Sequence, residues 1–145
     1  MSETLTQLAR PSHTAVGTVL PELRIPVTAT LIVTGAIATR DFQLVHHDRA
    51  AALAAGTKDV FMNILTTNGL VNRFVGGWAG PTARITRINI RLGATNFPGD
   101  ELVLNGTIDT AEGDELSIAI VGTNKLGTHV TGTVYVTIPA RKETA

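Results

Sequence analysis

The densest group of polar residues in the chain lies between Thr39 and Asp48, flanked by apolar segments. Asp41 and His46 are five residues apart, a spacing at which neither a helix nor a strand repeats. An irregular turn can aim both side chains at one point, where a carboxylate holds a water molecule and an imidazole transfers a proton near neutral pH. The pair is therefore a candidate hydration or hydrolysis site. The alternative is that Asp41 caps a turn and that His46 and His47 are exposed on a loop.

We do not expect metal chemistry in this group. The chain has no cysteine, and no three His, Asp or Glu residues recur at ligand spacing on one element. Adjacent side chains such as those of His46 and His47 rarely point the same way, so a shared ion is not expected. The sequence therefore predicts neither a metal nor another cofactor. His129 is expected at the surface.

Composition limits the class of protein. The chain has 145 residues, 43% of them hydrophobic, and a formal net charge of zero. These values predict one domain with a real core and argue against a general nucleic-acid binder, which needs a basic surplus. No secretory signal or membrane-length apolar run is visible, so a cytoplasmic protein that does not bind membranes is expected. We expect an arm over 1–13, one domain over 14–138 and a tail over 139–145.

The second half of the chain alternates apolar and polar residues, as half-buried strands do. The alternation runs through four segments, separated by turn residues at 98–100, 112–114 and 125–127. It predicts four successive strands in an antiparallel meander.

The first half of the chain carries helix signals. Asp48 is suited to cap a short alanine-rich helix that stops at Gly56. Asp59 is a candidate cap for a longer helix, apolar over most of its circumference and ended by Gly76 and Gly77. A strand is expected near 23–27, and residues 28–38 fit either a helix or an extended segment. A buried helix and an amphipathic sheet together predict an α+β fold in which the sheet wraps the helix.

The segment Asp41-Phe42-Gln43-Leu44-Val45-His46 resembles the Asp-x-Asn-Pro-aliphatic-His signature of the MaoC-like (R)-specific enoyl-CoA hydratases. The helix ending at Gly56, the helix start at Met62-Asn63 and the turn Phe97-Pro98-Gly99-Asp100 follow in the family's order. The resemblance implies a hotdog fold, an antiparallel sheet wrapped around a central helix. It also implies addition of water across the C2=C3 bond of a trans-2-enoyl-CoA.

A narrower resemblance involves the runs 38–43, 45–49, 63–66 and 78–81. These runs are similar to the small MaoC-like subunit of actinobacterial steroid side-chain hydratases, which implies a steroid enoyl-CoA substrate and a second hotdog subunit as partner. A homodimer is the alternative assembly. The alternative functions are a non-catalytic hotdog subunit, a hotdog thioesterase and a short-chain enoyl-CoA hydratase.

The family resemblance implies roles for individual residues. Asp41 and His46 would share the catalytic water, and Gln43 would orient that water or the imidazole. The backbone N–H of Asn63, next to Met62, would polarise the thioester carbonyl. Three basic residues are candidates for binding the CoA phosphates, the alternative being a solvated face or a partner contact: Arg84, Arg87 and Arg91.

The chain departs from the family signature around these residues. Arg40, Gln43 and Leu44 replace the usual Gly, Asn and Pro, and Met62-Asn63 replaces the common His-Gly pair. The two groups that the chemistry needs, on Asp41 and His46, are intact.

Overall fold

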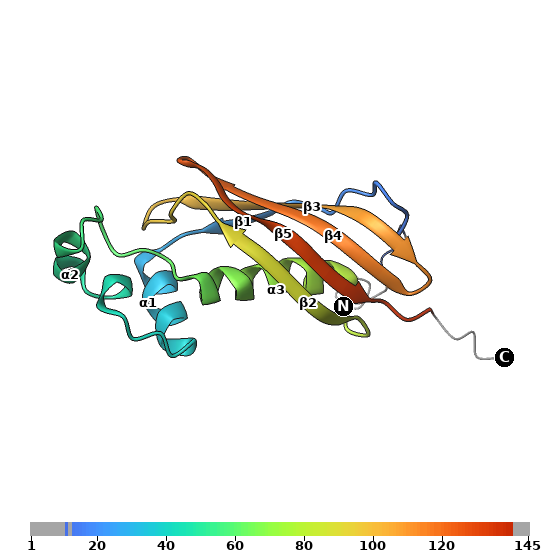
Figure 1. Cartoon of the computed structure of the whole chain (residues 1–145), viewed down its shortest axis with the longest axis horizontal. Helices are drawn as coiled ribbons and strands as arrows, with labels where there is room; N and C mark the ends of the chain where they lie inside the picture. Colours follow the sequence, from blue (N-terminus) through green and yellow to red (C-terminus); the bar gives the residue numbers. More distant parts are fainter. Residues whose placement is uncertain (1–10, 12, 141–145) are drawn as a thin grey trace, which may run out of the picture.

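The computed structural model describes residues 11 and 13–140. Five strands and the longest helix form one layered unit, with two shorter helices grouped at one end (Figure 1). In chain order the elements are β1 (Leu23–Pro26), α1 (Ala29–Ala38), the 3-10 turn η2 (Leu44–His46), α2 (Arg49–Ala54), α3 (Ile64–Ala79), β2 (Arg84–Leu92), β3 (Glu101–Glu112), β4 (Glu115–Asn124) and β5 (Gly127–Thr137).

The sheet has the strand order β1-β3-β4-β5-β2, and each neighbouring pair is antiparallel. All four strands predicted in the second half exist, but the four-strand meander is wrong. Two-residue turns join β3 to β4 and β4 to β5, which makes each pair neighbours. The connection over 93–100 between β2 and β3 is longer and crosses the end of the sheet. Strand β2 therefore lies at the far edge and pairs with β5, where Ile88 is opposite Val134.

The central helix α3 lies against the concave side of the sheet (Figure 1). Its buried residues recur at helical spacing, and the inward side chains of β3, β4 and β5 pack on them. The core therefore lies between α3 and the sheet, and the predicted hotdog fold is confirmed. The side chains of α3 that are buried are Thr66, Thr67, Leu70, Val71, Phe74, Val75 and Ala79.

Only one face of α3 is buried, which corrects the expectation of burial over most of its circumference. Asn72 and Arg73 are exposed on the opposite face. The helix is capped by Asn63, not Asp59, and it runs past the predicted stop at Gly76 and Gly77. It ends at Ala79, and the C-cap residue Gly80 has a φ of 90°, in the region that glycine adopts freely.

The shorter helices follow local signals. Asp48 caps α2 by accepting a hydrogen bond from Ala51 N at 3.0 Å, as predicted. Residues 29–38, left open between helix and strand, form α1, and Thr28 Oγ1 caps it by accepting from Leu31 N at 3.0 Å. The predicted arm and tail fall mainly outside the described residues.

Helices α1 and α3 cross closely at Gly35. A Cβ added there would lie 2.3 Å from Thr66 Oγ1 and 2.8 Å from Thr66 Cγ2, well inside van der Waals contact. Gly35 is therefore required by packing between the helices. This crossing sets the distance between the end of α1 and the start of α3.

We expect Gly35→Ala to lower the free energy of unfolding by about 1–3 kcal/mol, the usual cost of overpacking. Thr66→Ala should recover most of that loss, because the nearest remaining atom, Thr66 Cβ, is 3.1 Å away. Gly69→Ala is the matched control, since nothing lies within 4 Å of its added Cβ. Urea unfolding of the four proteins measures this, and a Gly35→Ala chain as stable as wild type would contradict the crossing.

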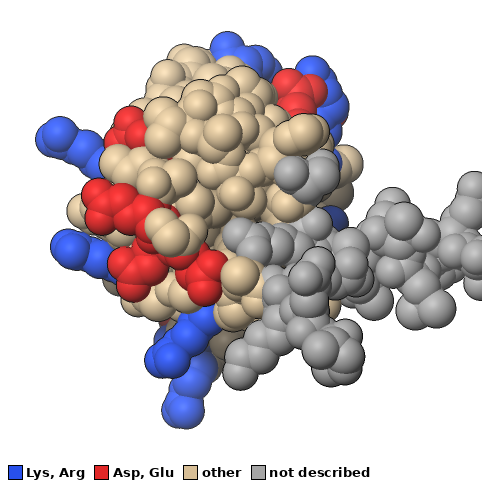
Figure 2. Space-filling view, turned by 90° about the vertical axis from the view of Figure 1, so that its right-hand side faces the viewer, with Lys and Arg blue, Asp and Glu red and all other residues tan. Residues whose placement is uncertain are grey.

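The described surface carries charged residues of both signs, in line with the formal net charge of zero. At the end of the molecule seen in Figure 2, acidic and basic side chains lie among uncharged ones, and neither sign covers the face. No helix in the described part of the chain is long and apolar enough to cross a membrane.

Candidate active site

Asp41 and His46 meet at the end of α1. The chain leaves this helix through Arg40, which has a left-handed φ of 58°, and Asp41 N donates to Ala36 O at 2.9 Å. The turn η2 then brings His46 back, so that its Nε2 lies 3.4 Å from Asp41 Oδ2. The convergence predicted from the five-residue spacing is present. Glycine adopts this conformation without strain, in line with the glycine of the family signature that this segment resembles.

A hydrogen bond at Nδ1 fixes the orientation of the His46 imidazole. Nδ1 lies 2.7 Å from the carbonyl oxygen of Phe61, which only accepts hydrogen bonds, so Nδ1 carries the proton and donates it. The ring also packs edge-on against the Phe61 ring, with centroids 4.9 Å apart. In neutral His46 this arrangement leaves the lone pair of Nε2 facing Asp41. The side chain is only 7% exposed, so His46 is not the loop histidine of the alternative prediction.

The carboxylate of Asp41 accepts two hydrogen bonds. Asn63 Nδ2 donates to Oδ2 at 3.0 Å, and the backbone N–H of Gln43 reaches Oδ1 at 3.4 Å. The donor from Asn63 is the main reason that the pKa of Asp41 lies below its ordinary value, although burial opposes the shift. Asp41 is therefore ionised at neutral pH and 19% exposed, open to a ligand.

The start of α3 supplies a backbone donor beside this pair. Asn63 is the N-cap residue and is 3% exposed, and its N–H has no acceptor among the described residues. The first N–H groups of a helix have no acceptor within the helix, so this one is available to an acceptor from outside the chain. The N–H of Met62 donates to Asn96 O at 3.1 Å, so of the two predicted residues only Asn63 offers a donor.

No described hydrogen bond joins the side chain of any other predicted site residue, apart from Asn63, to the pair. The Gln43 side chain is exposed and makes no hydrogen bond within the described residues, so only its backbone contacts Asp41. Arg84, Arg87 and Arg91 are exposed on the edge strand β2. Arg84 begins that strand, far from α1 and α2, whereas Arg91 lies near its other end (Figure 1).

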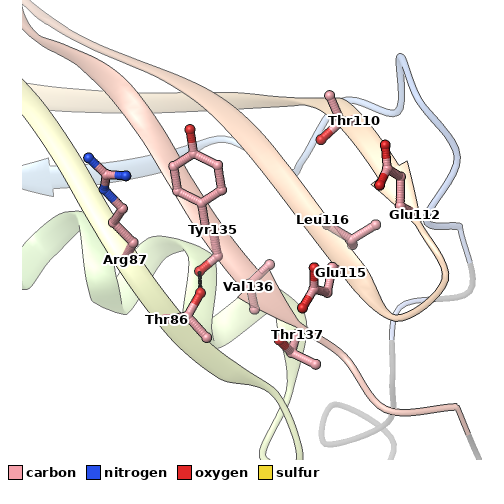
Figure 3. Close-up of a pocket in the computed structure, with 9 residues that line it drawn as sticks. All are labelled: Thr86, Arg87, Thr110, Glu112, Glu115, Leu116, Tyr135, Val136 and Thr137. Atoms are coloured by element: carbon pink, nitrogen blue, oxygen red, sulfur yellow. Dashed lines mark hydrogen bonds between the residues drawn. The ribbon is translucent and has the colours of Figure 1, made fainter.

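Arg87 lines a cavity of about 430 Å³, but this cavity is separate from the candidate site. Figure 3 shows Arg87 and Tyr135 at one side of it and Glu112 and Glu115 at the other. Tyr135 is exposed between buried neighbours of β5, so the cavity opens on the face of the sheet turned away from α3. Asp41 does not line it. The Arg87 guanidinium lies over the Tyr135 ring, 5.8 Å from its centroid.

The burial and the hydrogen bonds of a second histidine, His129, were not predicted from the sequence. His129, expected at the surface, is 1% exposed. Its Nδ1 donates to Ala94 O at 2.6 Å and its Nε2 lies 2.9 Å from Thr67 Oγ1, while burial lowers its pKa. It is neutral at pH 7 and ties β5 to the first turn of α3. Within the described residues no three His, Asp or Glu side chains are grouped as a metal site.

The fold and the site together define a class: a hotdog domain with an Asp–His pair at the N-terminal end of its central helix. Residues 12–128 match the sequence model of the MaoC like domain. The chain is also 50% identical over 121 residues to the 3-oxo-4,17-pregnadiene-20-carboxyl-CoA hydratase beta subunit of Mycobacterium tuberculosis, covering 83% of this chain and 94% of that protein. The chain therefore belongs to the MaoC-like family.

Solved structures agree with this assignment. The structure of the ChsH1–ChsH2 complex from Mycobacterium tuberculosis contains a chain with 47% identity and a TM-score of 0.85, covering 88% of this chain and 100% of that chain. The R-hydratase PhaJ1 from Pseudomonas aeruginosa has a TM-score of 0.80 at 18% identity, covering 88% and 84%. At that identity PhaJ1 supports the fold alone.

Proposed function

We propose that this chain is the catalytic subunit of an enoyl-CoA hydratase that adds water across the C2=C3 bond of a trans-2-enoyl-CoA. The observation that carries the proposal is the 3.4 Å separation of Asp41 Oδ2 and His46 Nε2. The relative named as a pregnadiene-carboxyl-CoA hydratase subunit favours a steroid side-chain thioester as the substrate.

The two groups suit a shared water molecule. Their separation is less than twice the ~2.8 Å length of a hydrogen bond, so one water oxygen can form hydrogen bonds with both atoms. As that oxygen bonds to C3, the Asp41–His46 pair takes one proton from the water and delivers one proton to C2, which adds one water in total. The proton belongs to the coupled pair, not to one residue.

The thioester oxygen requires its own donor. Charge moves onto this oxygen as the water attacks C3, and the free N–H of Asn63, at the positive end of α3, is suited to stabilise it. One such donor lowers a barrier by roughly 3 kcal/mol in other enzymes. The Asn63 backbone is thus the predicted thioester contact.

The second subunit of the proposed enzyme would pair at β2. This nine-residue edge strand has no partner on one side among the described strands, and its inward residues Ile85, Ile88 and Ile90 are only half buried. A long unpaired edge of this kind is normally covered. The opposite edge, β1, has four residues and ends at Pro26. The relative in a two-component complex favours a different hotdog chain as the partner.

Binding of the CoA phosphates by Arg84, Arg87 and Arg91 stays a prediction. Arg91 is the strongest candidate because it lies near the end of β2. From this end the chain continues to Asn96, whose carbonyl oxygen accepts a hydrogen bond from the N–H of Met62.

Assays with two substrates test the function. The purified chain, alone and with its candidate partner, is incubated with a trans-2-enoyl-CoA and with the matching saturated acyl-CoA. Loss of the enoyl absorbance with formation of the 3-hydroxyacyl-CoA is expected. Release of free CoA from the saturated substrate would identify a thioesterase instead, and homodimer activity confined to short enoyl-CoAs would contradict the steroid substrate.

A further inference from the structure

The side chain of Asn63 joins the candidate carboxylate to the helix cap. Its Oδ1 accepts from Thr66 N at 2.9 Å, which caps α3. Its Nδ2 donates to Asp41 Oδ2 and to Thr39 Oγ1, each at 3.0 Å. One buried carboxamide therefore contacts three residues: Thr66 in α3, Thr39 at the C-cap of α1 and Asp41 in the turn that follows.

The hydrogen bonds fix the orientation of this carboxamide. Only an oxygen accepts from the Thr66 N–H, so the nitrogen must face Thr39 and Asp41. The Thr39 hydroxyl donates to Gly35 O at 2.8 Å, which leaves its oxygen free to accept from Asn63. The amide cannot flip without losing the cap, so Asp41 always meets an N–H donor there.

We propose that the Asn63 carboxamide is a positioning group that holds Oδ2 of Asp41 against Nε2 of His46. The role is separate from that of the Asn63 backbone N–H. Its catalytic consequence rests on the proposed hydratase function, but the contact itself does not. The effect on the acidity of Asp41 follows from the same contact, because a donor at a carboxylate oxygen stabilises the ionised form and lowers the pKa.

Few other charges act on Asp41. His46 on η2 is the titratable group that faces it, and Arg40 precedes it in the chain. Neither α1 nor the first turn of α3 contains a titratable residue. Loss of the Asn63 donor should therefore appear directly in the titration of Asp41.

Two substitutions separate the side chain from the backbone. Asn63→Gly removes the carboxamide but keeps the backbone N–H, and glycine is nearly as good a helix cap as asparagine. Asn63→Asp keeps the cap and the shape, but it turns a second carboxylate oxygen toward Asp41 Oδ2 in place of the N–H donor. The control is Thr28→Ala, which removes the cap of α1 and leaves Asp41 untouched.

The first readout needs no substrate. Carbon-13 NMR of the full chain in its assembled form follows the Asp41 carboxyl through a pH titration. We expect the Asn63→Gly midpoint to rise relative to wild type, and the Thr28→Ala midpoint to stay. In Asn63→Asp the two carboxylates share a proton, so one midpoint should rise by at least about one pH unit. An unchanged Asp41 midpoint in Asn63→Gly would overturn the proposal, whatever the protein catalyses.

The second readout is the pH profile of kcat/KM for enoyl-CoA hydration. Protonation of Asp41 ends activity at low pH, so a higher Asp41 pKa moves the acidic limb upward. Both Asn63 variants should show that movement, and Thr28→Ala should not. If the carboxamide were only a cap, Asn63→Asp would keep the wild-type profile, which would also overturn the proposal. If the NMR midpoints move but no variant or wild type hydrates, the positioning role stands and the hydratase function fails.

Discussion

Asp41→Asn is expected to lower kcat/KM for enoyl-CoA hydration by roughly 10²–10⁴-fold, the usual contribution of a positioned proton-transfer group. The new amide has nearly the same shape and still offers an oxygen to Asn63 Nδ2, so the fold should be kept. It cannot take up a proton from water near neutral pH. Steady-state kinetics of the assembled protein, with thermal unfolding as a check on folding, measure the effect.

Asp48→Asn is the matched control for that substitution. It makes the same chemical change seven residues away in the same segment, where Asp48 caps α2 and is exposed. Asparagine caps as well as aspartate, so activity should be unchanged. Full hydration by the Asp41→Asn assembly would show that the chain is a non-catalytic subunit beside an active partner.

His46→Asn is expected to cause a loss of similar size, roughly 10²–10⁴-fold in kcat/KM. The shorter amide can still donate to Phe61 O in place of Nδ1–H, which keeps the local anchor, but it removes Nε2. His47→Asn, on the exposed neighbouring residue, should leave kcat/KM near the wild-type value. A His46→Asn enzyme with normal kcat/KM would contradict the acid–base role.

The double variant Asp41→Asn/His46→Asn tests whether the two groups act as a unit. Groups that handle one proton together lose their effect together, so the double variant should be about as slow as the slower single variant. Rate losses that multiply would show that Asp41 and His46 contribute independently.

The elements that were predicted correctly are those that the residues within them determine. Strands β3 to β5 follow from alternation, because one face packs on α3 and the other does not. The cap of α2 follows from Asp48 alone. Residues 29–38 could not be assigned, because ATLIVTGAIA is largely apolar, with Thr30 and Thr34 as its polar residues, and carries no clear periodicity.

Features set by distant contacts were missed. The place of β2 beside β5 depends on how the connection over 93–100 crosses the sheet, which alternation does not encode. His129 was expected at the surface, but it is buried. The β4–β5 register shifts between Gly122 and Thr123, and near that irregularity His129 and Val130 are both buried.

The candidate site was predicted only where its contacts are local in sequence. Asp41 and His46 are close in sequence, so the assumption of a single turn was enough to predict that their side chains converge. The Asn63 side chain is 22 residues from Asp41, and its contact depends on the crossing of α1 and α3 at Gly35. A backbone role at Asn63 was foreseen, but the carboxamide contact was not.

Every described group that hydrogen-bonds to the Asp41 or His46 side chain lies between Thr39 and Thr66. The strands of the sheet supply none of these bonds. The proposed chemistry is thus encoded in one continuous stretch of the gene, while the sheet that packs on α3 is encoded elsewhere. Drift or recombination in the strands can therefore alter the sheet without replacing the residues that hold the proposed reacting groups.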